Sequence, residues 1–172
     1  MLLEFSILNQ LPVGSFEEGG LIGKVAKTIF SKSEGRVLGF LVKLPGVFSG
    51  QKIASFEDVI SIDQAGVVVR SSESLVDKNE IVRVNEILKS NFSLLGLKAV
   101  AKDKKNLGRV SDALIDTDSG ELMRLYVKHF FSSLVFERSQ IQEITLKNVV
   151  LKAEREEKAK KPIENLAQAE VA

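Results

Sequence analysis

The chain has 172 residues, enough for one ordinary domain or two small ones and too few for a typical multidomain enzyme. Its 24 basic and 23 acidic side chains leave a formal charge of +1, so no strong overall attraction to nucleic acid or anionic lipid is expected. The lack of cysteine excludes disulfides, thiolate nucleophiles and zinc sites with cysteine ligands. The single histidine, His129, excludes a histidine-rich metal cage.

The sequence contains no segment typical of export or of a membrane span. The first eight residues lack a basic region and are interrupted by polar side chains. Nowhere does the chain have the run of about 18 apolar residues that a membrane-spanning helix requires. These features predict a cytoplasmic protein with no membrane insertion.

An internal repeat is the clearest feature of the sequence. Residues 23–43 and 108–128 match without a gap at an offset of 85. The apolar positions agree between the two segments, and so do the glycines expected in turns. We interpret the segments as two copies of one unit. The identical pairs are Gly23/Gly108, Val25/Val110, Gly35/Gly120, Val42/Val127 and Lys43/Lys128.

Each copy is predicted to consist of short β-strands. Residues 28–30 and 37–42 form one predicted hairpin, and residues 113–115 and 122–127 form the equivalent one, each with a glycine late in its turn. The later segments 58–62 and 142–146 are aligned with each other, as are 67–69 and 149–151. Turns separate these strands at intervals of about ten residues, which is typical of an all-β unit.

Apolar residues in the second strand of the first hairpin occur at both parities. The pattern predicts that Leu38, Phe40 and Val42 face one way, while Val37 and Leu41 face the other. A strand covered on both faces fits a small closed barrel that also packs against another element. The other barrel is the expected neighbour.

The segment between the copies predicts a helix at about 78–90. Asp77 is the expected cap, and Glu80 can return a hydrogen bond to its backbone amide. Ile81, Val84 and Leu88 then fall on one helical face, which is expected to pack on a barrel. After residue 152 the composition becomes strongly charged, which predicts a helical tail ending at Pro162 and a disordered last segment.

The residues of both copies resemble the PRC-barrel. This small β-barrel occurs in the photosynthetic reaction-centre H subunit and at the C-terminus of ribosome maturation factors. The second copy carries the clearer resemblance, and the two copies cover most of the chain. The matching segments are 95–100, 103–106, 107–116 and 119–120 in the second copy, and 11–13, 21–25, Gly35 and 53–60 in the first.

The resemblance implies two PRC-like barrels in tandem with a role in assembly. The expected organisation is a first barrel at 1–70, a linker with a helix at 71–92, a second barrel at 93–151 and a charged tail at 152–172. The residues at hand show no counterpart of the N-terminal domain of ribosome maturation factors or of the membrane helix of the H subunit, so neither specific role is expected to transfer. The expected function is a non-enzymatic cytoplasmic adaptor that binds a protein partner, with no cofactor and no metal.

Aromatic side chains in loops are expected to fold back on a barrel or to seal the contact between the two barrels; if they bind a partner instead, they are the candidate partner-binding residues. These residues are Phe48, Phe130 and Phe131. The alternative function is an RNA-associated ribosome maturation factor, which contacts a ribosomal protein or the RNA backbone. Its candidate residues are the basic cluster at 98–109, Lys98, Lys102, Lys104, Lys105 and Arg109.

Catalytic chemistry is not expected from the remaining candidates. His129 has no sequence neighbour that would build a catalytic pair with it. The segment Asp116–Glu121 resembles a calcium loop, but Val127 stands where an EF-hand loop needs a bidentate glutamate. We interpret this segment as a hairpin turn, since such turns favour Asp, Ser and Gly for backbone reasons.

Overall fold

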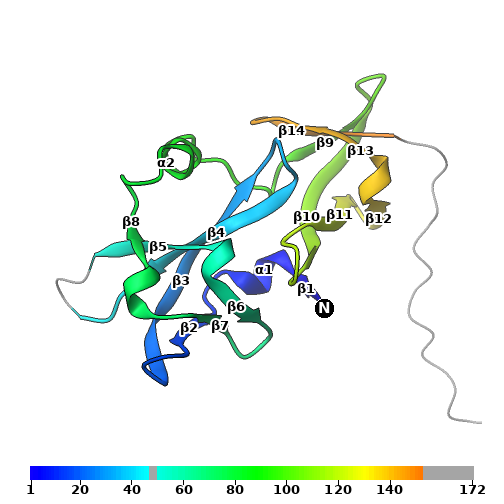
Figure 1. Cartoon of the computed structure of the whole chain (residues 1–172). Coiled ribbons are helices and arrows are strands. Elements are labelled where there is room, and N and C mark those ends of the chain that lie inside the picture. Colours follow the sequence, from blue (N-terminus) through cyan, green and yellow to red (C-terminus); the bar gives the residue numbers. More distant parts are fainter. Residues whose placement is uncertain (47–49, 153–172) are drawn as a thin grey trace, which may run out of the picture.

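The structure is a computed structural model that describes residues 1–46 and 50–152, most of which lie in strands (Figure 1). The all-β class predicted from the sequence is therefore confirmed. The first sheet has the strand order β6-β7-β2-β3-β4-β5-β8. Its strands are β2 (Pro12–Ser15), β3 (Gly20–Ser31), β4 (Arg36–Lys43), β5 (Gln51–Ser55), β6 (Val59–Ile62), β7 (Val67–Val69) and β8 (Val76–Asp77).

The second sheet has the strand order β13-β14-β9-β10-β11-β12, and the N-terminal strand β1 also pairs with β10. The first half of the chain thus adds a strand to the sheet of the second half. The strands are β1 (Leu2–Glu4), β9 (Lys98–Ala101), β10 (Asn106–Asp116), β11 (Leu122–His129), β12 (Ser132–Glu137), β13 (Ile141–Ile144) and β14 (Asn148–Leu151).

The two sheets repeat one topology. In both, one parallel pair (β2 with β7, and β9 with β14) lies among antiparallel neighbours. Val25 pairs with Val42 in the first sheet, and Val110 pairs with Val127 in the second, as the repeat in the sequence requires. The alignment of the late segments at 58–62 and 142–146 is wrong by two residues, because β6 and β13 are equivalent from their first residues onward.

The two copies contact each other through equivalent residues of their hairpin turns. The Val37 N–H donates to the Gly120 carbonyl (2.8 Å), and the Leu122 N–H donates to the Gly35 carbonyl (2.9 Å). Each atom pair is the counterpart of the other under the offset of the repeat. Reciprocal contacts of this kind are what an approximate two-fold axis produces.

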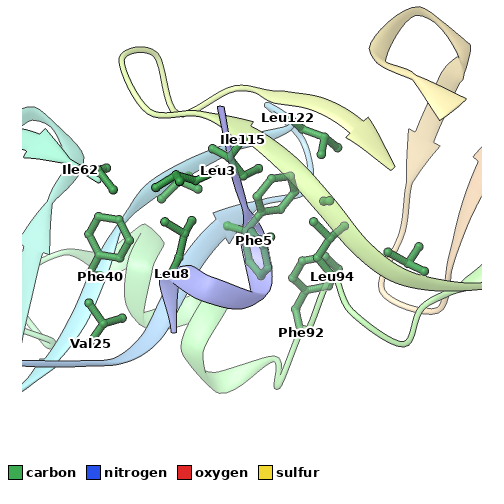
Figure 2. Packing of buried hydrophobic residues seen from close by; sticks show 14 of the residues in the cluster. Leu3, Phe5, Leu8, Val25, Phe40, Ile62, Phe92, Leu94, Ile115 and Leu122 are labelled. Atoms are coloured by element: carbon green, nitrogen blue, oxygen red, sulfur yellow. The ribbon is translucent and has the colours of Figure 1, made fainter. Parts of the chain in front are cut away.

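One hydrophobic core joins both sheets, the four-residue helix α1 (Phe5–Leu8) and the linker. Phe30 packs edge-to-face on Phe5 (5.9 Å between ring centroids) and stacks on Phe92 (6.3 Å). Figure 2 shows Phe5 and Phe92 converging with Ile115 from the second sheet. The continuous core ties the two copies together, since aromatic pairs add to the free energy of burial.

The linker helix α2 (Val82–Lys89) begins later than predicted. Asp77 does not cap it and lies in β8 instead, but its backbone N–H does donate to the Glu80 carboxylate (3.3 Å). That bond closes a turn before the helix, in which the Glu80 N–H donates to the Asp77 carbonyl. The predicted apolar stripe of α2 is confirmed, because Val84 is buried on the first sheet with Ile81 and Leu88 beside it.

The predicted facing of residues along β4 is wrong, and a β-bulge is the reason. Ile29 pairs with Gly39 and Phe30 with Val37, so Leu38 has no partner on β3. The extra residue places Val37 in the shared core with Phe40 and Val42, and leaves Leu38 with Leu41 on the opposite face. That face is covered by α2 and not by the second sheet, which corrects the predicted neighbour.

Two predictions from the sequence lie outside the described residues. One is the assignment of Phe48 as a partner-binding residue. The other is the helical and disordered tail after residue 152.

Candidate functional site

The two sheets differ in what covers their outer faces. On the first sheet, Ile29, Leu41 and Ile53 are buried beneath α2. Their counterparts on the second sheet, by repeat and by strand register, are Leu114, Tyr126 and Val135, which are all half-buried. Among the described residues, α2 packs on β3 and makes no comparable contact with β10, β11 or β12, so it does not cover this second group, which we call the outer face.

The edges of the sheets differ in the same way. In the first sheet β8 pairs with β5, joining Val76 to Ile53 and Asp77 to Lys52. β12 is the counterpart of β5, and within residues 1–46 and 50–152 it pairs with β11 alone. β12 pairs with β11 over six residues and contains neither a bulge nor a proline. Either of these would discourage a further strand from pairing with this edge. We call its unpaired side the open edge.

The backbone groups at the open edge follow from the hydrogen bonds at the end of β12. The Glu137 N–H donates to the Gln140 side chain (2.8 Å) and therefore not to Arg124, its partner on β11. Backbone groups of alternate residues in an antiparallel strand point to the same side. Ser133 and Val135 thus direct their N–H and C=O groups away from β11, in the way that Ile53, the counterpart of Val135, faces β8.

The connection between β11 and β12 presents two aromatic rings to solvent. It consists of Phe130 and Phe131 alone, and their relative exposures are 81% and 106%. Phe130 has φ +50°, a conformation that hairpin turns normally give to asparagine, aspartate or glycine. This left-handed conformation costs a residue with a bulky side chain about 1–2 kcal/mol. We call these residues the aromatic tip. Both rings are exposed to solvent, so neither folds back on a barrel.

A row of basic residues crosses the second sheet beside the aromatic tip. Arg109 pairs with Lys98 on β9 and with Lys128 on β11, and all three side chains are exposed. Residues directly opposite each other in a sheet share a face. The outer surface beside β12 is therefore positively charged, and we call these three residues the basic row.

The other predicted basic residues lie at the same end of the sheet. Lys102, Lys104 and Lys105 occupy the turn between β9 and β10, where Asp103 accepts a hydrogen bond from the Lys105 N–H (3.0 Å). The β9–β10 turn comes after Lys98 in the chain, and the aromatic tip comes after Lys128. These two hairpin ends lie next to each other at one end of the sheet. The fold thus brings together aromatic and basic candidates that the sequence keeps apart.

Arg109 is held differently from the lysines. Its guanidinium donates to the Gly96 carbonyl (2.9 Å), which fixes the side chain near the linker. Within the part of the chain that the structure describes, no hydrogen bond or ion pair holds the lysine side chains, which extend into solvent from exposed positions.

The remaining sequence candidates have local structural roles. His129 contacts the Phe130 ring at 4.6 Å between centroids, which supports the aromatic tip. The Asp118 backbone N–H donates to Asp116 (3.0 Å) and holds the pKa of that carboxyl below its ordinary value. Across residues 1–46 and 50–152, no group of three or more His, Cys, Asp and Glu side chains is placed to hold a metal ion.

A scan against models of known protein families and a search of curated proteins both find no match to this chain. Within the part of the chain that the structure describes, no helix has the length and apolar character needed to cross a membrane.

The open edge and the outer face could not be found by looking for reactive residue types. The available signal was a difference between the copies. Lys52 of the first copy corresponds to Leu134 of the second, and Leu41 corresponds to Tyr126. The sequence cannot show that these positions lack a cover, because a cover is a tertiary feature.

Proposed function

We propose that the chain is a non-enzymatic adaptor, built from two PRC-like barrels in tandem, that binds a protein partner through its second sheet. The observation that carries this proposal is the unequal covering of the two copies. The first sheet is completed by β8 and α2, whereas the equivalent edge and face of the second sheet are open. An unpaired regular strand beside exposed aromatic side chains is a feature that proteins retain for binding.

The resemblance to the PRC-barrel is consistent with this role. The repeated strand order and the turn glycines at equivalent positions support a duplicated small β unit. The resemblance implies a docking function, and the unequal covering indicates which copy docks. The first copy then acts mainly as a rigid support, tied to the second through the shared core.

A second candidate function, RNA binding in ribosome maturation, is favoured by one observation. The aromatic tip lies at the same end of the sheet as the basic row and the β9–β10 turn that carries Lys102, Lys104 and Lys105. Aromatic rings that stack bases, next to cations that contact phosphates, are what single-stranded RNA sites use. Such binding would weaken steeply as the salt concentration rises, because phosphate contacts release counterions.

Capture from native lysate, with and without nuclease, separates the two functions. We expect a discrete protein to be retained after nuclease treatment, and its recovery to fall at least tenfold for the Phe130→Ser/Phe131→Ser double variant. Phe16→Ser is the matched control, since Phe16 is an exposed phenylalanine on the first copy (71%). Recovery of RNA that disappears with nuclease supports the second candidate. Equal recovery by wild type and the tip variant contradicts a role for the aromatic tip.

A further inference from the structure

The chain itself shows how an edge like that of β12 is filled. β8 adds to β5 as an antiparallel strand, with Val76 opposite Ile53 and Asp77 opposite Lys52. Val76 also packs against the apolar cluster on the outer face of the first sheet. The backbone bonds therefore extend the sheet, and one side chain seals the outer face.

We propose that the open edge of β12 accepts an extended segment of the protein partner as an added antiparallel strand. This inference rests on the proposed function and specifies how the partner is held. Strand addition uses the backbone groups of Ser133 and Val135 that point away from β11. The segment takes the place on β12 that β8 takes on β5.

The side chains of β12 define the chemistry of the partner segment. A residue opposite Val135 meets the outer face at Tyr126, so it is apolar. The next residue lies opposite Leu134, which packs on the core where the first copy has Lys52, so it is also apolar. The third lies opposite Ser133, whose small side chain leaves Lys128 within reach, so it is acidic.

The partner segment therefore reads apolar, apolar, acidic from its N- to its C-terminal side. Its C-terminal end approaches the aromatic tip, which directly precedes Ser132 in the chain. The chain contains the same order of residue types in Leu75, Val76 and Asp77, which would place Leu75 opposite Val135, one residue out of the register that β8 has on β5. A peptide of residues 72–80 is therefore a suitable probe, since the β5 edge is already occupied by the tethered copy of this segment.

Amide hydrogen exchange of the full chain, with and without this peptide, tests the proposal. We expect saturable slowing of exchange within 132–137 and no change at Gln51–Ser55. Val135→Pro should weaken binding at least tenfold, because proline removes the outward N–H while an edge position tolerates its ring. Val135→Lys is the second variant; it keeps the backbone donor but places a charge on the outer face. Both variants should retain cooperative melting.

Matched controls separate backbone pairing from charge. Glu143→Lys changes an exposed residue on β13, at the other end of the sheet, and should leave peptide affinity unchanged. A peptide with Asp77→Lys should bind at least fivefold more weakly, and the difference should shrink at high salt.

Three outcomes overturn the proposal. The first is no protection of 132–137 at millimolar peptide, and the second is protection at another edge. The third is binding that appears only after truncation following Lys152, which would assign the edge to the chain's own C-terminal segment. If strand addition fails but nuclease-resistant capture still depends on the aromatic tip, the adaptor function stands without this mode of binding.

Discussion

Replacing Val110 by aspartate is expected to unfold the chain at room temperature or to lower its free energy of unfolding by about 4 kcal/mol or more. Val110 is 2% exposed, and its pair Val127 is fully buried in the core that both sheets share. An aspartate there has no cationic partner, so it must either be buried as an unpaired charge or take up a proton. Denaturant unfolding followed by circular dichroism measures the loss.

The repeat predicts the same outcome for its counterpart. Val25 is 1% exposed, and Val25→Asp should be as damaging as Val110→Asp. The neighbouring exposed residue supplies the control: Ser111→Asp removes only the hydrogen bond that the Ser111 hydroxyl donates to the Tyr126 carbonyl (3.2 Å), so it should lower stability by about 1 kcal/mol, far less than either valine variant. Wild-type melting of either valine variant would contradict the register on which the repeat rests.

Gly108→Ala is expected to lower the free energy of unfolding by about 2–5 kcal/mol, from backbone strain together with steric overlap. Gly108 has φ +119°, and a Cβ built on it would lie 2.3 Å from the Lys128 carbonyl oxygen. The obstructing atom belongs to the backbone, so no side-chain rotation relieves the contact. The same measurement of denaturant unfolding applies.

A second glycine separates the two contributions. Gly19 also has positive φ (+63°), but a Cβ built there meets nothing within 4 Å. Gly19→Ala should therefore cost only the backbone term, about 1–2 kcal/mol. If Gly19→Ala and Gly108→Ala lowered the free energy of unfolding equally, the close approach of β10 to β11 would not contribute to the cost of Gly108→Ala.

The repeat explains why these positions are identical in the two copies. Gly23 and Gly108 each lie against the carbonyl of an equivalent lysine, Lys43 or Lys128. The repeated glycines could be found from the sequence because one residue type satisfies a close backbone contact. The paired hairpins were predictable for a related reason, since alternation of apolar residues fixes strand register where a face is buried.

Two kinds of feature could not be predicted from the sequence. One depends on a single inserted residue in a strand, and the other depends on which segments contact each other in the folded chain. The unpaired Leu38 reverses the facing of Val37, and no local pattern marks a bulge within an apolar run. The helix α2 begins at Val82 because the residues after Asp77 form a turn that competes with the first helical turn. Both differences are local and leave the strand order unaffected.

In the candidate site too, the residue types could be predicted from the sequence, but their spatial arrangement could not. Phe130 and Phe131 were recognised from their residue type, and Lys98 and Arg109 from their charge. Their grouping at one end of the second sheet follows only from the pairing of β9, β10 and β11. The open edge carries no residue signature, because it is defined by a missing neighbour.

Residue-resolved amide hydrogen exchange of the isolated chain tests the central claim most directly. If the second copy is open where the first is covered, the Ile53 amide should be protected by β8, and the Val135 amide should exchange at least 100-fold faster. The two residues occupy equivalent positions in equivalent strands, so each serves as the reference for the other. A Val135 amide as protected as that of Ile53 would show that the edge of β12 is already filled, which would contradict the account.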